Sequence, residues 1–293
     1  LKYKTQVFLS PSADHIRTRL THTLEVTQIA RTIARALDLN EDLTEAIGMG
    51  HDLGHTPFGH AGERALARVF PGFRHNEQSL RVVERLEKNG SGLNLTAETR
   101  DGILRHSKPE KAITGEMAGT PATAEAQVMK IADGIAYINH DFDDAVRGRM
   151  LLEADLPANV KRVLGTSHAC RMNRLVEDVV ETSVPNLDAP VAGRQVIAMS
   201  DEVLAATNEM RDFLFDRVYA PINDQPATRH AEHIVESLFA HYLARPEELP
   251  EVIAPALEGE LLERRVADVI SGMTDRYATR CYESIFVLRS EEF

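Results

Sequence analysis

The stretch that decides both fold and chemistry is His51-Asp52-Leu53-Gly54-His55-Thr56-Pro57-Phe58-Gly59-His60-Ala61-Gly62-Glu63. It places three histidines, an aspartate and a glutamate close together in the chain. Neutral imidazole is the commonest protein ligand for transition metals. The adjacent pair His51-Asp52 offers one nitrogen and one oxygen ligand from a single helical turn, and such a mixed set suits divalent ions better than a thiolate site would. The segment therefore predicts a metal-dependent hydrolase site on a helical scaffold.

The composition around this segment favours helix over sheet. Hydrophobic residues make up 43% of the 293 residues, whereas aromatic residues make up only 5% and tryptophan is absent. This length suits one large domain or two smaller ones. The net charge of −12 argues against a surface that coats nucleic acid. The chain also lacks a basic stripe, an aromatic platform and a recognisable nucleic-acid-binding motif.

Hydrophobic periodicity extends the helical prediction along the whole chain. We expect an all-α protein and divide it at the segment 185–193, into a helical core domain over residues 1–184 and a helical extension packed on it over 185–293. Residues 107–121 are expected to form a loop because they combine proline, glycine and threonine. The expected helices cover residues 13–38, 41–54, 60–69, 76–88, 97–106, 122–147, 156–182, 194–218, 228–243, 247–257 and 259–284.

The cysteines and the longest apolar runs bear on the cellular compartment. Cys170 and Cys281 are far apart and form neither a zinc-type pair nor a disulfide framework. We interpret both as reduced thiols in the core. No apolar run approaches the roughly 20 residues that a membrane span needs. We therefore expect a cytoplasmic protein without a membrane partner.

Polar residues recur on the apolar faces of two predicted helices and beside the apolar face of a third. His22 and His51 each lie on an apolar stripe, and the long helix 122–147 carries Asp133, Tyr137 and Asp141 at i, i+4 and i+8. A single histidine in such a place is more often a core residue with its hydrogen bonds satisfied, and a polar line is often a solvated face. Two histidines with a carboxylate beside one of them weigh against those explanations, because an uncompensated carboxylate is costly inside a protein.

The order H…HD…D on helices resembles the HD-domain superfamily of metal-dependent phosphohydrolases. The longer blocks are similar to its deoxynucleoside-triphosphate triphosphohydrolase branch, the dGTPase-like proteins. The similarity extends from residues 4–8 nearly to the C-terminus, so it covers most of the chain. The blocks that carry it are residues 51–63, Phe73-Arg74-His75-Asn76-Glu77-Gln78-Ser79, residues 132–141 and Gly272-Met273-Thr274-Asp275-Arg276-Tyr277-Ala278.

The resemblance implies a reaction and a metal. The reaction is hydrolysis of a dNTP at the α-phosphorus, which gives deoxynucleoside and inorganic triphosphate. The resemblance implies one divalent ion, held by His22, His51, Asp52 and Asp133. We expect Mn²⁺ or Mg²⁺ there; the softness of the ligands would also suit Fe²⁺, Co²⁺, Ni²⁺ or Zn²⁺.

The resemblance also assigns roles around the metal. Glu63 would orient His60, which would protonate the leaving 5′-oxygen, and Arg19 would contact phosphate. Gly134 stands where some relatives carry a basic residue that touches phosphate, so the clamp on the phosphates is expected to be either weaker or completed by residues from elsewhere in the chain. The remaining implied contacts are His55 and His75 with the triphosphate, and Tyr137, Asp141 and Gln6 with the sugar, where the first two would select deoxyribose.

Two other functions stay open at this point. One is a different HD-type phosphohydrolase, such as a nucleotidase or phosphodiesterase, and the other is a regulatory protein that binds nucleotides and has lost hydrolysis. The resemblance implies a homo-oligomer, with a hexamer suspected, and an allosteric dNTP remains possible. The sequence fixes neither the preferred base nor the role of residues 272–278.

Overall fold

The computed structural model describes residues 1–6, 17–107, 119–187, 194–250 and 259–287. Within these ranges the regular structure is helical, apart from one antiparallel bridge between Thr5 and Thr18. The all-α prediction is therefore confirmed. The first half contains α1 (Arg19–Ala36), α2 (Glu41–Gly50), α3 (Gly59–Val69), α4 (His75–Arg81), η1 (Val82–Leu86), α5 (Ala97–Arg105) and α6 (Ala124–Arg147).

The second half continues with short and long helices in alternation. None of the described helices is long and apolar enough to cross a membrane. The elements are η2 (Glu153–Asp155), α7 (Ala158–Leu164), α8 (His168–Ser183), η3 (Val184–Asn186), α9 (Asp201–Leu214), η4 (Phe215–Tyr219), α10 (Ala220–Asn223), α11 (Pro226–Ala244), η5 (Pro246–Glu248), α12 (Leu262–Gly272), α13 (Asp275–Tyr282) and η6 (Glu283–Val287).

Side-chain caps define where many of these helices begin. In α1, the Thr18 side chain accepts a hydrogen bond from the backbone N–H of Thr21, and in α6, Thr123 does the same for Ala126. Such caps satisfy amide groups that have no partner in the first turn of a helix. The same arrangement begins five more helices, with the capping residues Asn40, Thr96, Ser167, Ser200 and Thr274.

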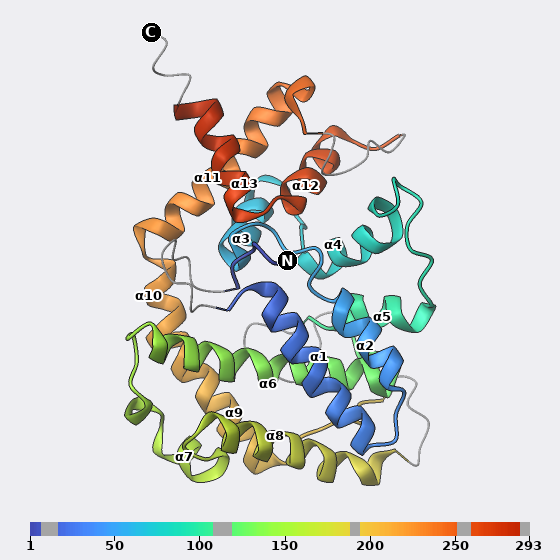
Figure 1. The fold of residues 1–293 in the computed structure, drawn as a ribbon, viewed down its shortest axis with the longest axis vertical. Coiled ribbons are helices and arrows are strands. Elements are labelled where there is room, and N and C mark those ends of the chain that lie inside the picture. The colour runs from blue at the N-terminus through green and yellow to red at the C-terminus, as the bar shows by residue number, and fades with distance from the viewer. Residues whose placement is uncertain (7–16, 108–118, 188–193, 251–258, 288–293) are drawn as a thin grey trace.

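The long helix α6 forms the centre of the larger core. It packs against α1, α2 and α5 and also against α8 and α9, and Figure 1 shows it crossing the lower half of the molecule with α1 passing over it. Ile131, Ile135, Ile138 and Phe142 are almost fully buried along it. Because α6 is fixed on several sides, a polar side chain such as Asp133 is held in a defined position beside α1 and α2.

A second core lies in the upper half of Figure 1, where α11 packs against α3, α12 and α13. Leu66 on α3 belongs to the same cluster of buried residues as Leu238 and Val266. Residues on both sides of position 185 contribute to each core: Val203 belongs to the larger one and Leu66 to the smaller one. The division into 1–184 and 185–293 therefore stays a prediction.

The structure corrects several helix boundaries. The single helix expected over 156–182 is two helices, because Gly165 adopts φ 102°, a left-handed conformation that breaks the helical path. The helix expected over 259–284 is divided where Met273 and Thr274 are extended. Helix α2 ends at Gly50, before the position predicted near His55. Residues 251–257 of the helix expected over 247–257 lie outside the described part.

The prediction that both cysteines belong to the core was wrong for Cys170. Cys170 is exposed, whereas Cys281 is half-buried and packs against the smaller core. Both are free, as expected. Cys170 is in the first turn of α8, which follows a solvent-facing turn, and the apolar face of that helix is filled by Leu175 and Val179 instead.

Candidate metal centre

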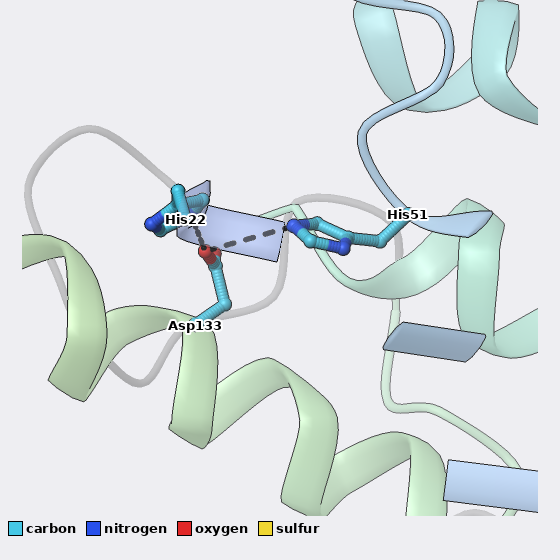
Figure 2. A group of neighbouring side chains, drawn as sticks. All are labelled: His22, His51 and Asp133. Carbon is cyan, nitrogen blue, oxygen red and sulfur yellow. Dashed lines mark hydrogen bonds and ion pairs between the residues drawn. The ribbon is translucent and has the colours of Figure 1, made fainter. Parts of the chain in front are cut away.

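Three helices bring His22, His51 and Asp133 together. His22 lies in the first turn of α1, His51 follows the last residue of α2, and Asp133 lies on α6. The Asp133 Oδ1 atom is 3.2 Å from Nε2 of His22 and 3.9 Å from Nε2 of His51. Figure 2 shows both imidazoles directed at the Asp133 carboxylate. These residues offer ligand atoms that all lie within 4.8 Å of one another.

The donor atoms of this group fit a divalent ion. The Nδ1 atom of His51 donates to the carbonyl of Gly48 at 2.7 Å, so its Nε2 atom carries the lone pair. That Nε2 atom is buried and has no hydrogen-bond partner among the described residues. Bonds of about 2.1 Å to a metal place neighbouring ligand atoms about 3.0–4.2 Å apart. The observed separations fall in this range, and an oriented, unpartnered imidazole is typical of a metal ligand.

Asp52 also adjoins His51. Its Oδ1 atom is 3.5 Å from Nε2 of His51 and 3.4 Å from Nε2 of His55, while Oδ2 accepts a 2.5 Å hydrogen bond from the Arg19 guanidinium. Burial by itself would raise the pKa of Asp52, but Arg19, followed by His51 and His22, brings that pKa well below its usual range. Asp52 is therefore a buried carboxylate that adjoins both histidines.

A second group begins at Asp52 and continues through His55 and His75. The two imidazoles are stacked, with ring centroids 4.0 Å apart. Nδ1 of His75 and its backbone N–H both donate to Oε1 of Glu63 at 2.8 Å. Burial lowers the pKa of His75, but the carboxylate of Glu63 more than offsets this and leaves the pKa raised. Glu63 in turn has a pKa well below its usual range, because His75 and His60 outweigh its burial.

His60 differs from the other histidines of this cluster in being accessible. Its side chain is 48% exposed, and Nδ1 lies 3.5 Å from Oε2 of Glu63. The ring of Tyr137 meets it edge-on, with centroids 6.4 Å apart. The structure therefore brings His60 and Glu63 together and leaves the His60 imidazole open to solvent.

Tyr137 and Asp141 are joined by Tyr219, which the sequence did not single out. The Tyr219 hydroxyl donates to Oδ2 of Asp141 at 2.5 Å, and its ring stacks on that of Tyr137 with centroids 5.6 Å apart. Burial raises the pKa of Asp141 to about 8, although the hydrogen bond from Tyr219 lowers it. Tyr219 is on η4, far along the chain, so no local pattern connects it to Asp141.

His106 is a further histidine of this cluster, and the sequence analysis did not identify it. It follows α5, is buried, and its Nε2 atom lies 3.2 Å from Nε2 of His75. Its Nδ1 atom donates to the carbonyl of Ile103 at 2.7 Å. Burial, with further contributions from His51 and His75, lowers the pKa of His106 to about 3. Its only signal in the sequence is a single histidine at the end of a predicted helix.

Comparison with known proteins agrees with this geometry. Residues 19–138 match the HD domain and residues 197–284 match the phosphohydrolase-associated domain. A deoxyguanosinetriphosphate triphosphohydrolase-like protein of Caldanaerobacter subterraneus subsp. tengcongensis is 51% identical over 288 residues, which is 98% of this chain and 80% of that protein. The chain belongs to the deoxyguanosinetriphosphate triphosphohydrolase-like family.

Other members of this family are similar over the same span. A deoxyguanosinetriphosphate triphosphohydrolase-like protein of Clostridium perfringens (strain SM101) is 46% identical over 288 residues, and one of Desulfatibacillum aliphaticivorans is 46% identical over 298. Each alignment covers 98% of this chain and 82% of the relative. The chain is therefore an HD-domain phosphohydrolase with His and Asp clusters that could bind a metal ion.

The phosphohydrolase-associated part of this family member reaches the site through Asp275. Its carboxylate accepts backbone hydrogen bonds from Thr5 and from Phe58, both at 2.9 Å. Close by, the buried Lys4 ammonium donates to the carbonyls of His55 and Ser271. Residues 272–278, whose role the sequence left open, thus hold the N-terminal segment against the loop that carries His55 and leads into α3. Next to Thr5, Gln6 is buried and its carbonyl accepts a hydrogen bond from Arg19.

Replacing Asp275 with Ala should loosen this loop. Two backbone amides would lose their acceptor, at about 1–3 kcal/mol for each one that stays buried. We expect a lower melting temperature and a hydrolysis rate reduced by roughly tenfold to a hundredfold, because small displacements of catalytic groups slow reactions strongly. Asp275→Asn keeps one oxygen acceptor and should give intermediate values. Calorimetry and phosphate-ester assays on both variants test this; an unaltered rate in Asp275→Ala contradicts it.

Proposed function

We propose that this protein hydrolyses deoxynucleoside triphosphates, dGTP among them, to deoxynucleoside and inorganic triphosphate. The observation that carries the proposal is that His60, which pairs with Glu63, packs edge-on against His55, and that Nε2 of His55 lies 3.4 Å from Asp52, the neighbour of the group of His22, His51 and Asp133. One set of residues fits a divalent ion, and the other offers an accessible proton donor next to it. The names of the relatives support the same reaction class.

We assign the ion to His22, His51, Asp52 and Asp133. A bound divalent ion would polarise the α-phosphate and acidify an attacking water. Two imidazoles and two carboxylates suit Mn²⁺, Fe²⁺, Co²⁺, Ni²⁺ or Zn²⁺ by ligand softness, and Mg²⁺ by cellular abundance. We favour Mn²⁺ or Mg²⁺. The low pKa of Asp52 keeps it in the ionised form that a metal requires.

His60 acts as the general acid in this proposal. Water attacks the α-phosphorus, the bond from that phosphorus to the 5′-oxygen breaks, and His60 gives its proton to the leaving oxygen. Glu63 remains ionised because of its depressed pKa, so it can hold the His60 imidazole and stabilise its charged form. Arg19, His55 and His75 lie next to this centre and supply positive charge or hydrogen bonds to the triphosphate.

We place the sugar at Tyr137 and Asp141, with Gln6 nearby. The Tyr137 ring adjoins His60, so a 5′-oxygen at His60 brings the deoxyribose to this face of α6. Asp141 would hydrogen-bond the 3′-hydroxyl while Tyr137 occupies the space of a 2′-hydroxyl. A site of this type rejects the wrong sugar strongly, because that sugar either clashes or leaves buried polar groups unpaired.

The raised pKa of Asp141 predicts a measurable effect on stability. The folded protein keeps this proton up to about pH 8, whereas the unfolded chain releases it near the ordinary value of 3.8. Unfolding therefore releases a proton in this interval, so the Asp141 contribution to stability falls as the pH rises from about 4 to 8 and is constant above. Asp141→Asn removes the titration. Its melting temperature should exceed that of the wild type by a margin that grows over this interval.

Thermal unfolding at a series of pH values measures that margin. We expect it to reach at least roughly 2 °C at pH 8, which corresponds to about 1 kcal/mol for a protein of this size. Asp212→Asn is the matched control, because Asp212 is 68% exposed and its replacement should give no pH-dependent margin. A margin for Asp141→Asn that stays flat between pH 4 and 8 contradicts the assignment.

A product assay tests the proposed reaction directly. The protein is incubated with each dNTP and each rNTP in Mn²⁺ or Mg²⁺, and the products are separated by ion exchange. Triphosphate and deoxynucleoside from dNTPs alone support the proposal. Release of pyrophosphate or monophosphate shows a different HD-type phosphohydrolase, and tight dNTP binding without turnover shows a regulatory protein.

We further propose that the protein assembles into a homo-oligomer, with a hexamer as the expected form and dNTP as a candidate allosteric ligand. One chain has a mass of 32.6 kDa. Light scattering after size-exclusion chromatography, with and without dNTP, measures the mass in solution. A mass that stays at 32.6 kDa in both cases contradicts the assembly.

A further inference from the structure

The imidazoles of His75 and His106 meet at their Nε2 atoms, which are 3.2 Å apart. Nδ1 of His106 donates to the carbonyl of Ile103, and Nδ1 of His75 donates to the ionised carboxylate of Glu63. A carbonyl oxygen and an ionised carboxylate only accept hydrogen bonds, so both Nδ1 atoms carry a hydrogen. The contact between the two rings is therefore decided by what their Nε2 atoms carry.

One hydrogen lies between these two Nε2 atoms. Two bare lone pairs at this distance repel and two N–H groups clash, whereas one N–H directed at one lone pair forms a hydrogen bond. A ring with hydrogens on both nitrogens is positively charged, and the Glu63 carboxylate lies 2.8 Å from Nδ1 of His75. The hydrogen therefore belongs to His75. His106, whose Nδ1 meets only the uncharged carbonyl of Ile103, is the acceptor.

The surrounding helices fix the place of this hydrogen bond. His75 is the first residue of α4, and His106 directly follows α5. The two helices pack against each other and lie side by side in Figure 1, and α5 also packs against α2 and α6. The Asn76 side chain donates to the carbonyl of Leu104 at 2.6 Å, which joins the two helix ends a second time. His106 thus holds one side of the His75 ring while Glu63 holds the other.

These hydrogen bonds limit how His75 can act on a bound anion. Both N–H groups of its ring are used, one by Glu63 and one by His106. The ring therefore contributes its positive charge, and its face stacks on His55 with centroids 4.0 Å apart. Nδ1 of His55 has no hydrogen-bond partner among the described residues, so a ligand atom can satisfy it.

We propose that His106 is a positioning residue for His75: its Nε2 lone pair accepts the His75 Nε2–H and, with Glu63, keeps the charged ring stacked on His55 where the triphosphate binds. The inference rests on the proposed function, in which His55 and His75 contact the triphosphate. A ring that is held at both nitrogens loses little freedom when the anion binds. Without the acceptor, triphosphate binding is weaker while the metal ligands are unchanged.

Steady-state kinetics with dGTP test whether His106 acts through His75. His106→Leu keeps a side chain of similar size but removes the acceptor. We expect its KM to rise roughly tenfold while kcat stays within about threefold, because the lost interaction serves binding. The double variant His75→Ala with His106→Leu should be no slower than His75→Ala alone, because a residue that acts only through His75 has no effect without it. Losses that add in the double variant overturn the proposal.

His106→Gln separates the hydrogen bond from the bulk of the ring. The amide oxygen of glutamine reaches about as far as Nε2 of histidine, so this variant should keep KM within about threefold of the wild type. His241→Leu is the control for replacing a shielded histidine, because the His241 side chain is 8% exposed and pairs with Glu248 on η5. It should leave the kinetics unchanged. Circular dichroism melting shows that each variant is folded.

Metal content distinguishes an effect on His75 from an effect on the metal. The His106 ring also packs edge-on against His51, with centroids 5.0 Å apart. If His106 acted through that contact, His106→Leu would lose Mn²⁺ and kcat would fall. We expect full Mn²⁺ content in this variant. A loss of Mn²⁺ overturns the proposal.

Nuclear magnetic resonance of the resting protein is independent of the reaction. With ¹⁵N-labelled histidine, His75 should show a hydrogen on both ring nitrogens at neutral pH and His106 a hydrogen on Nδ1 alone. The signals are assigned from their loss in His75→Ala and His106→Leu. A single hydrogen on His75, or a hydrogen on Nε2 of His106, overturns the inference even if triphosphate is released.

Failure of the proposed function gives a different pattern. If no dNTP is hydrolysed, binding of inorganic triphosphate at a fixed Mn²⁺ concentration, measured by calorimetry, replaces the kinetic readout. Binding that is roughly tenfold weaker in His106→Leu and restored in His106→Gln supports the positioning role without the reaction. Equal binding by the wild type and His106→Leu removes that role.

Discussion

Asp52→Asn is expected to abolish nucleotide hydrolysis while the helical fold remains. Asp52 contacts Nε2 of His51 and pairs with Arg19, and an amide supplies neither the charge nor the basicity that a divalent ion requires. A metal ion contributes several kcal/mol to the stabilisation of a phosphoryl transition state. A loss of about 4 kcal/mol corresponds to a rate roughly a thousandfold lower. Triphosphate release and bound Mn²⁺ should both be measured, because both should fall.

A matched control distinguishes the effect of losing a metal ligand from the effect of losing a buried ion pair. Asp268 on α12 is also buried and pairs with Arg81 at 2.6 Å, but it lies outside both groups of metal-binding atoms. Asp268→Asn should lower the melting temperature and leave hydrolysis within about threefold of the wild type. If Asp52→Asn keeps more than a tenth of the wild-type rate and its full metal content, Asp52 is not a ligand.

Short-range sequence patterns were sufficient to predict much of the candidate site. His51 and Asp52 are neighbours in the sequence, and His60 and Glu63 are one helical turn apart, so their proximity follows from local geometry alone. His22 stands on the apolar stripe of its helix, and Asp133 begins a polar line beside the apolar stripe of another, but it was the family resemblance that assigned both to one ion. In the structure their side chains do meet.

Contacts between distant segments could not be predicted in the same way. His106, Tyr219 and Asp275 lie far from their partners in the sequence, and each depends on how whole helices pack. Their residue types are ordinary for a helix end or a first turn, so they carry no local signal. The break at Gly165 was missed because one glycine inside a periodic segment is compatible with either a continuous helix or a turn.

His60→Gln is expected to slow hydrolysis of a dNTP by about a hundredfold to ten-thousandfold, the usual contribution of general acid catalysis. The His60 imidazole is half-exposed, next to the ionised Glu63 and edge-on to Tyr137, so it is the accessible proton donor among the site histidines. Metal binding should be unchanged, because His60 belongs to neither group of candidate ligands. Steady-state rates with dGTP and the Mn²⁺ content of the variant measure both effects.

A substrate with a different leaving group tests whether His60 acts by donating a proton. In a dNTP analogue with sulfur in place of the bridging 5′-oxygen, the leaving thiol has a pKa near 8.5, as in cysteine, and departs as a thiolate without protonation. His60→Gln should therefore slow the analogue by less than about tenfold. His230→Gln changes another exposed histidine, on α11, and should affect neither substrate. Equal losses of rate on the oxygen and sulfur substrates would show that His60 positions the nucleotide and transfers no proton.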